Sequence, residues 1–168
     1  MRRCAARRST IRRAAPELRT KILVDTNILL RLADPASAQH QLAGDAVERL
    51  IRRGDELCLV PQVVAEFWYA ATQPVARNGL GFPFETVAAE HSRFLRIFRL
   101  LRDEPAIYDV WERFVLEHQV TRGRLYDARL VAALEVHGFD RLLTFDTRDF
   151  ARWSVSLLEP GTVMSGDD

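Results

Sequence analysis

The chain has 168 residues, of which 48% are hydrophobic and 28% charged, and its formal net charge is +1. The length predicts one domain with a sizeable core, and the composition is that of a globular protein, which argues against disordered, collagen-like and coiled-coil classes. Uncharged runs are too short to span a membrane. Two cysteines, Cys4 and Cys58, are too few for a disulfide framework or a cysteine-based zinc site, so we expect a soluble, cytoplasmic protein.

The net charge is unevenly distributed along the chain. Residues 1–20 contain seven arginines and one acid, Glu17, so this segment carries +6 and residues 21–168 carry −5. No apolar stretch long enough for a secretory signal follows the basic start. We interpret the segment as a basic extension, and three alternatives stay open: a disordered tail or start-site artefact, a nucleic-acid-binding arm, and an organelle transit peptide. The domain is expected to cover residues 21–160, followed by a short tail of residues 161–168.

From residue 21 onward, short apolar runs alternate with helical patterns, which is typical of βα units around a parallel sheet. The apolar runs predict strands at residues 22–24, 57–60, 98–101, 141–144 and 155–158. Helices are predicted near residue 28 and over residues 37–53, 61–72, 105–118 and 125–137, and a Pro- and Gly-rich loop follows residue 74. A further helix begins near Phe84 and is expected to present Val87, Ala88, His91, Phe94, Leu95 and Phe98 on one side. The predicted fold class is α/β, with a central, mainly parallel sheet of four to five strands.

Acidic residues occur at positions that the pattern marks as inward-facing. Asp25 follows the first apolar run, at the carboxyl end of a strand, where open α/β sheets bind ligands. The alternative is that Asp25 or Asn27 caps the next helix. Glu66 interrupts an apolar helical stretch, and a buried carboxylate there needs a partner. Its alternative is an edge position or an ion pair with an arginine such as Arg77.

Two further acids repeat this arrangement later in the chain. Asp127 heads an apolar stripe in the first turn of its helix, where the alternative is a helix-dipole acid paired with Arg124 or Arg129. Asp146 lies just beyond a predicted strand, and Asp149 follows three residues later. The alternative is that both acids stabilise a turn or cap a helix.

Together, the four acids are expected to converge on one crevice if the strands are parallel. Four carboxylates close together repel one another and cannot all ionise without a cation. Oxygen-only ligation favours Mg²⁺ or Mn²⁺ over zinc, because the four histidines show no paired spacing typical of a metal site. Magnesium held by carboxylates commonly supports phosphoryl chemistry.

The motifs around these acids resemble those of the PIN-domain nucleases, in particular the VapC-type ribonuclease toxins of bacterial toxin–antitoxin pairs. The likeness rests on the order and context of four segments: KILVDTNIL at residues 21–29, Glu66, Tyr126-Asp127-Ala128, and LTFDTRDF at residues 143–150. It covers residues 21–160 and implies a PIN-like three-layer α/β/α fold. The basic extension departs from the usual start of such domains, just before the first strand.

The resemblance also implies the roles of single residues. Asp25, Glu66, Asp127 and Asp146 would form an acidic catalytic quartet, in which Asp25 and Asp127 are direct ligands of Mg²⁺ or Mn²⁺. Thr26, Asn27, Thr144 and Asp149 would support them. Arg122, Arg124 and Arg148 are the best-placed candidates for RNA contacts, with solvated arginines as the alternative. The implied reaction is metal-assisted hydrolysis of an RNA phosphodiester without participation of the 2′-OH.

The implied partners are an RNA substrate, a cognate antitoxin protein and a second copy of the chain in a homodimer. The antitoxin is expected to fill a groove beside the acids. Five aromatic residues are candidates for lining this groove, with core packing as the alternative: Phe67, Trp68, Tyr69, Phe82 and Phe84.

Other functions fit the residues less well or stay open. A haloacid-dehalogenase-like phosphatase needs an aspartate where Asn27 stands, and a receiver domain needs a late lysine, whereas Lys21 is the only lysine. A PIN-domain ribonuclease of RNA processing and a non-catalytic PIN module that binds RNA or protein remain alternatives to the toxin.

Overall fold

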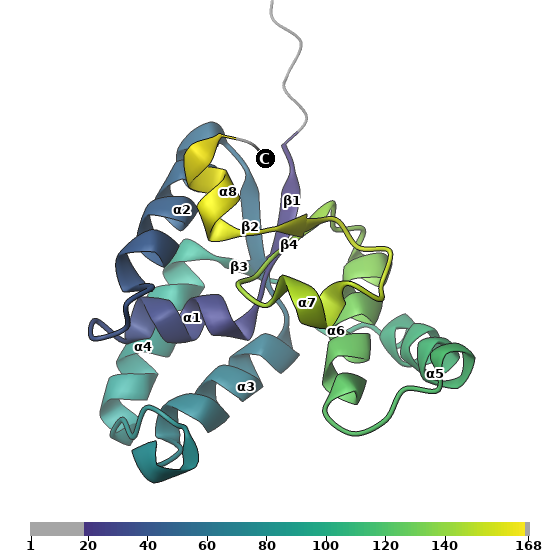
Figure 1. Ribbon diagram of the computed structural model, residues 1–168, viewed down its shortest axis with the longest axis horizontal. Coiled ribbons are helices and arrows are strands. Elements are labelled where there is room, and N and C mark those ends of the chain that lie inside the picture. Colours follow the sequence, from purple (N-terminus) through teal and green to yellow (C-terminus); the bar gives the residue numbers. More distant parts are fainter. Residues whose placement is uncertain (1–18, 167–168) are drawn as a thin grey trace, which may run out of the picture.

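A parallel five-stranded sheet lies at the centre of the computed structural model, which describes residues 19–166 (Figure 1). Its order is β3-β2-β1-β4-β5, and all neighbouring strands run parallel. The strands are β1 (Lys21–Val24), β2 (Glu56–Leu59), β3 (Arg99–Leu100), β4 (Arg141–Leu143) and β5 (Leu157–Leu158). The predicted α/β class and three-layer α/β/α arrangement are confirmed. The predicted basic extension lies almost wholly outside the described residues.

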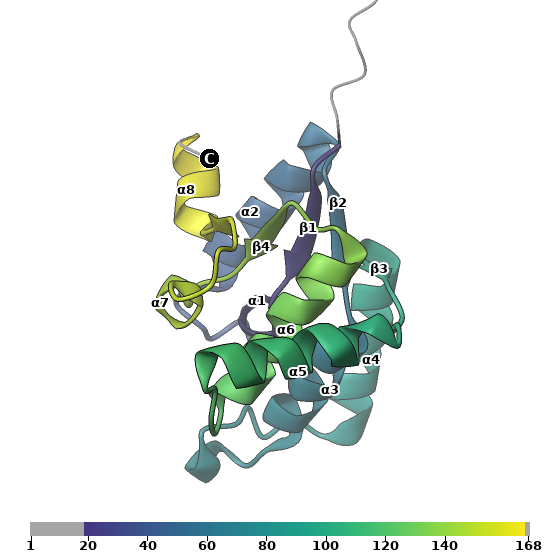
Figure 2. The same ribbon diagram turned by 90° about the vertical axis from the view of Figure 1, so that its right-hand side faces the viewer.

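Helices cover both faces of this sheet. The six long helices are α1 (Thr26–Ala33), α2 (His40–Arg53), α3 (Pro61–Thr72), α4 (Phe84–Ile97), α5 (Ala106–His118) and α6 (Arg124–His137). Figures 1 and 2 show α1 and α2 on one side of the sheet and α6 on the other, with α5 packed outside α6. Three shorter helical segments complete the described part: η1 (Val75–Arg77), α7 (Thr147–Phe150) and α8 (Pro160–Ser165).

Local sequence signals account for several helix boundaries. Pro61 occupies the first turn of α3, where its missing N–H is not needed. Gly54 and Gly138 end α2 and α6 with φ of 91° and 62°, a left-handed conformation that glycine adopts without the steric cost of a Cβ. These signals explain why the predicted and observed ends agree at these residues.

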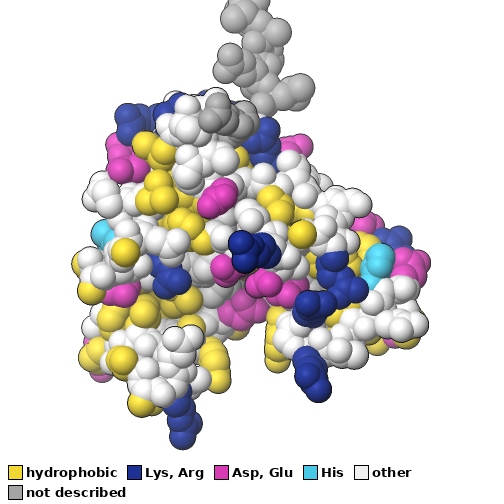
Figure 3. Space-filling model, in the orientation of Figure 1, with side chains coloured by type: hydrophobic (Ala, Val, Ile, Leu, Met, Phe, Trp, Pro, Cys, Tyr) yellow, Lys and Arg dark blue, Asp and Glu magenta, His cyan; other side chains and the backbone are white. Residues whose placement is uncertain are grey.

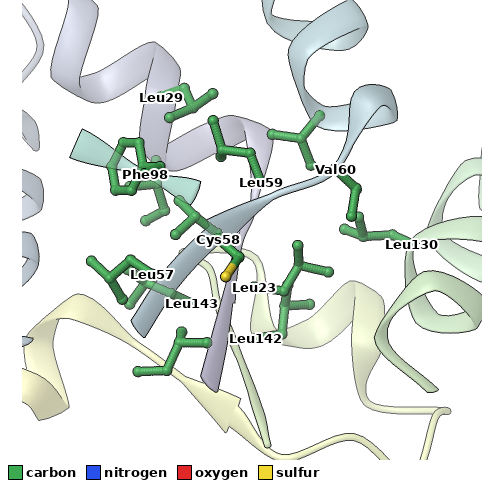
Figure 4. Packing of buried hydrophobic residues seen from close by; sticks show 14 of the residues in the cluster. Leu23, Leu29, Leu57, Cys58, Leu59, Val60, Phe98, Leu130, Leu142 and Leu143 are labelled. Carbon is green, nitrogen blue, oxygen red and sulfur yellow. The ribbon is translucent and has the colours of Figure 1, made fainter. Parts of the chain in front are cut away.

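The core is built around the central strands. Leu23 pairs in register with Cys58 on one side and Leu142 on the other, so these side chains share one face of the sheet. Figure 4 shows Leu130 of α6 reaching towards this region beside Val60. The Cys58 thiol is free and fully buried, and this burial raises its pKa to about 11. It therefore behaves as a core side chain.

Two sequence predictions differ from the structure. In α4, Val87 and Phe94 are buried, whereas Leu95 is 42% exposed, because α4 packs on α3 through a narrow face and Leu95 is about 100° further round. Phe98 follows the end of the helix. Most of the predicted tail forms α8, which buries Val163 and packs on α2. A helix of six residues is too short to show a helical period.

Among residues 19–166, no helix is both long enough and apolar enough to cross a membrane.

Candidate active site at the carboxyl edge of the sheet

A pocket of about 700 Å³ opens where β1 and β4 end. Its lining includes all four acids that the sequence pattern singled out: Asp25, Glu66, Asp127 and Asp146. Figure 3 shows acidic side chains at the inner end of a notch between two lobes, which Figure 1 identifies as α3 with α4 and α6 with α5. The parallel sheet brings together acids that are far apart in the sequence, because β1 and β4 are neighbours that end at the same edge.

Asp25 is the most buried acid of the site, with 8% of its surface exposed. Its Oδ1 accepts a hydrogen bond of 2.6 Å from the backbone N–H of Thr26, so it caps α1 as well as lining the pocket. Its Oδ2 accepts from the Thr144 hydroxyl at 2.7 Å and from the Asn27 amide at 2.9 Å. Three donors therefore hold this carboxylate in one orientation, and Oδ1 keeps a lone pair for a further partner.

Asn27 and Thr144 connect Asp25 to Asp146. The Asn27 amide nitrogen also lies 2.9 Å from Thr144 Oγ1 and 3.1 Å from Asp146 Oδ2. Thr144 Oγ1 accepts the backbone N–H of Asp146 at 3.0 Å, and Asn27 Oδ1 accepts that of Phe145 at 3.2 Å. These contacts tie the start of α1 to the segment after β4, and they place Asp146 at the exposed rim of the pocket.

Glu66 is held by a second set of contacts. The Thr26 hydroxyl donates to Oε2 at 2.8 Å, and the Gln62 amide donates to Oε1 at 2.8 Å. Gln62 also donates to the Tyr126 carbonyl at 2.9 Å and accepts from Arg129 at 3.1 Å. The amide cannot be flipped, because its oxygen would then face two acceptors. Gln62 thus links the helix that carries Glu66 to the helix that carries the next acid, and the predicted alternative of a Glu66–Arg77 pair is not observed among the described residues.

Asp127 differs from the other acids because no hydrogen bond from a described residue reaches its carboxylate. It lies in the first turn of α6, half-buried, and Arg129 pairs instead with Asp103 at 2.9 Å. Burial raises the pKa of Asp127, the negative charges of Asp149 and Glu66 raise it further, and Arg124 opposes them. All oxygen lone pairs of Asp127 are therefore free for a ligand.

The loop before α6 forms a second hollow beside the pocket, with a volume of about 600 Å³. Arg122 and Arg124 line it together with Asp127 and Asp149, so positive groups border the acidic pocket on this side. Arg148, the third arginine singled out in the sequence, is exposed in α7 between Asp146 and Asp149.

The ionisation of Asp25 gives the site a measurable pH dependence. Burial raises the pKa of Asp25 from 3.8 to about 6, the hydrogen bonds from Thr144 and Thr26 oppose this, and the charges of Glu66 and Asp146 add to it. An acid whose pKa is raised by folding destabilises the folded state once it ionises. The stability of the metal-free protein should therefore fall as the pH rises from about 4 through about 6.

We expect Asp25→Asn to remove this contribution. The free energy of unfolding of the variant minus that of the unsubstituted protein should increase by about 1.5 kcal/mol between pH 5 and pH 8 in EDTA. The reason is that the unsubstituted protein carries the buried charge at the higher pH and the variant does not. Urea unfolding of both proteins at several pH values measures this difference. A difference that is constant with pH would show that the Asp25 pKa is close to that of an exposed aspartate.

The donor set fits a hard divalent cation. The pocket offers carboxylate oxygens, while no group of three or more His, Cys, Asp or Glu side chains within residues 19–166 is arranged as a metal cage. Mg²⁺ is commonly held by one or two carboxylates together with water and substrate phosphate, so a closed cage is not needed. Asp127, with free oxygens, and Asp25, with a free lone pair on Oδ1, are the residues that would hold it.

Three polar residues that line the pocket were not among the predicted catalytic, metal-binding or RNA-contact residues: Gln62, Tyr69 and Tyr126. Tyr69 was expected only as part of the aromatic groove. Gln62 is four residues before Glu66 and Tyr69 three after it, so helical spacing places all three on one face of α3. Tyr126 directly precedes Asp127. The sequence singles out these positions only by their spacing from Glu66 and Asp127, so both acids must be identified first.

The predicted aromatic groove is not one continuous surface. Phe67 is buried against Phe94, and Trp68 packs between Phe84 and His91. Phe84 and Tyr69 are both exposed. The Phe84 ring contacts Trp68, whereas Tyr69 lines the acidic pocket. Core packing thus accounts for Phe67 and most of Trp68.

The sequence of this chain is similar to those of known proteins. Residues 22–155 match the PIN domain family. A curated relative, ribonuclease VapC24 of Mycobacterium tuberculosis, is 28% identical over 134 residues, which cover 79% of this chain and 91% of the relative.

Solved structures share the fold at lower sequence identity. VapBC2 from Rickettsia felis, bound to a DNA fragment from its promoter, has a TM-score of 0.63 and 13% identity over 83% of this chain and 98% of that one. The Mycobacterium tuberculosis toxin VapC20, which cleaves the sarcin-ricin loop, has a TM-score of 0.59 and 17% identity over 79% and 95%. PAE2754 from Pyrobaculum aerophilum has a TM-score of 0.58 and 24% identity over 88% of each chain.

Proposed function

The chain belongs to the PIN domain family, and from this premise we propose that it is a divalent-metal-dependent endoribonuclease that acts as the toxin of a toxin–antitoxin pair. The observation that carries the proposal is the convergence of Asp25, Glu66, Asp127 and Asp146 on one pocket at the carboxyl edge of the sheet. The curated relative is a ribonuclease, which supports hydrolysis of RNA. The reaction is cleavage of a phosphodiester bond by water.

We propose different roles in this reaction for the residues of the pocket. Asp25 and Asp127 would hold Mg²⁺ or Mn²⁺, which supplies a water of lowered pKa and offsets negative charge on the scissile phosphate. Thr26, Asn27 and Thr144 fix the direction of the Asp25 carboxylate before substrate arrives. Such fixed geometry avoids reorganisation during the reaction.

Glu66 and Asp146 complete the negative lining from two sides. Glu66 has one lone pair left on each oxygen after its bonds from Thr26 and Gln62, so it can accept a proton or a hydrogen bond from water in the pocket. Asp146 is exposed at the rim and keeps its second oxygen free for the same purpose. We propose that both are catalytic carboxylates that bind and orient water.

RNA binding by this pocket needs positive charge, because four carboxylates repel a polyanion. Arg122 and Arg124 border the pocket, and we propose that they contact phosphates next to the scissile one. Arg148 is an exposed third candidate. Asp149 lines the same hollow as these arginines and Asp127, and we propose that its negative charge attracts the arginines.

The direct test of this function is incubation of the purified full-length chain with RNA. We expect cleavage with Mg²⁺ or Mn²⁺, none in EDTA, and recovery when the metal is restored in excess. Cleavage that continues in EDTA would contradict metal dependence, and intact RNA under all conditions would contradict the nuclease function.

An antitoxin partner is proposed because several solved structures of the same fold are toxin–antitoxin complexes. We expect the product of a small neighbouring gene to co-purify with this chain at micromolar concentration and to inhibit RNA cleavage. We also expect a homodimer, which light scattering of the purified chain would detect. A neighbouring gene product that neither binds nor inhibits would favour a ribonuclease of RNA processing.

A further inference from the structure

Two exposed tyrosines face the acidic pocket from its opposite walls. The chain has only three tyrosines, and Tyr69 of α3 and Tyr126 of α6 both line the pocket. Their exposed fractions are 67% and 64%, among the highest of the large hydrophobic side chains in the described residues. Exposed rings at a polar site are not explained by core packing.

Hydrogen bonds position the Tyr69 hydroxyl and the Tyr126 backbone near the acids. Tyr69 lies three residues after Glu66 on the same helical face, and its hydroxyl accepts a hydrogen bond of 2.9 Å from the Gln73 amide. The Tyr126 carbonyl accepts from Gln62 at 2.9 Å, which fixes the backbone immediately before Asp127. Both tyrosines therefore line the same pocket as the four acids, Tyr69 from α3 and Tyr126 from α6.

Neither aromatic face is stacked on another ring of the described residues. Among residues 19–166, the aromatic contacts involve other side chains, including the pair Tyr108 and Trp111, and neither Tyr69 nor Tyr126 stacks on a ring. Each keeps a free aromatic face. A nucleobase that has left its stack is a planar partner for such a face.

The charges around the pocket favour a nucleic acid over an apolar peptide as the occupant. Acids line the pocket, and Arg122 and Arg124 line the adjoining hollow, which shares Asp127 and Asp149 with the pocket. A strand that places one phosphate among the acids and their cation would bring the next phosphate to these arginines and its bases to the tyrosine rings.

We propose that Tyr69 and Tyr126 form a stacking subsite for the two nucleobases that flank the scissile phosphate. This inference rests on the proposed ribonuclease function and adds two base-contacting residues to it. Stacking on a ring depends little on base identity, so the subsite carries little sequence preference of its own.

The test measures RNA binding in the full-length chain carrying Asp25→Asn, so that bound RNA is not cleaved. The probe is a short, fluorescein-labelled single-stranded RNA in Mg²⁺, followed by fluorescence anisotropy. We expect Tyr69→Leu and Tyr126→Leu each to weaken binding roughly 5- to 100-fold, and Tyr69→Phe and Tyr126→Phe to bind as the parent. Tyr108→Leu is the matched control, because Tyr108 is 57% exposed but lies outside the pocket.

A second probe distinguishes stacking from general apolar contact. The same RNA with abasic riboses in its central segment should bind the parent at least as weakly as normal RNA binds either leucine variant. On this abasic RNA the leucine variants should bind like the parent, because no base is left to stack. Leucine variants that bind normal RNA like the parent, or that lose as much on abasic RNA, would overturn the inference. So would leucine variants that lose only antitoxin binding, since the tyrosines would then belong to a protein interface.

The two proposals fail in different ways. If the unsubstituted chain cleaves no RNA while base-dependent binding remains, the ribonuclease function is wrong, and only base stacking by the two tyrosines is supported. If RNA is cleaved but the leucine variants bind it normally, only the stacking subsite is wrong.

Discussion

Asp25→Asn and Asp127→Asn are each expected to lower kcat/KM for RNA cleavage by roughly 100-fold or more. Asp25 is the acid that three donors hold in one orientation, and Asp127 is the acid whose oxygens are free. Replacing either carboxylate by an amide removes a negative ligand from the position proposed for the cation. The measurement is cleavage of a defined RNA at fixed Mg²⁺, with the metal then varied to separate lost affinity from lost turnover.

Asp109→Asn is the matched control for this experiment. Asp109 lies in the first turn of α5, as Asp127 does in the first turn of α6, but it is exposed and outside the pocket. This variant should cleave RNA like the unsubstituted protein. Thr144→Val, which removes one donor to Asp25, should have a smaller effect of about 10- to 100-fold. If both site variants cleave normally, the assignment of the acids is wrong.

The predictable part of the fold is the part with strong local signals. The runs that become β1, β2 and β4 are buried and apolar, and prolines and glycines mark the helix ends. The segments α7 and α8, of four and six residues, are too short for a helical period to be recognised. Their positions depend on contacts with α6 and α2, which a single sequence does not show.

The candidate site was predictable to a similar degree. Acids after strands or within apolar helical stretches are unusual, so Asp25, Glu66, Asp127 and Asp146 were candidates, each with a structural alternative. A parallel sheet was enough to expect them together. The links between them were not recognisable. Gln62 looks like an ordinary polar helix residue, and its role depends on Arg129, which is 67 residues away.

Electrostatic neighbours also depend on tertiary structure. Asp149 contributes more than Glu66 or Asp146 to the raised pKa of Asp127, although α7 and the start of α6 are separated by the whole of β4. The sequence suggested a supporting role for Asp149 but could not say which acid it faces. The charge of Asp127 is therefore disfavoured by those of Asp149, Glu66 and Asp146, and among the described residues Asp127 is the acid of the quartet whose carboxylate has no hydrogen-bond donor.

This repulsion predicts how Asp127→Asn changes thermal stability. Without metal, the variant should be at least as stable as the unsubstituted protein, because it removes a charge that burial and Asp149 disfavour. With Mg²⁺, the unsubstituted protein should gain about 2.7 kcal/mol at a hundredfold excess over Kd, since the folded site binds the ion and the unfolded chain does not. The variant should gain much less.

The competing explanation for Asp127 gives a different result in the same melting curves. If its charge only stabilised the amino end of α6, removing it would cost about 0.3–1 kcal/mol both in EDTA and in Mg²⁺. Asp109→Asn removes a first-turn acid from a helix that does not border the pocket. Its melting temperature should rise from EDTA to Mg²⁺ by as much as that of the unsubstituted protein. Equal Mg²⁺-induced shifts for the unsubstituted protein and Asp127→Asn would exclude Asp127 from the metal site, because an ion held by its carboxylate must stabilise the folded state less once that carboxylate is gone.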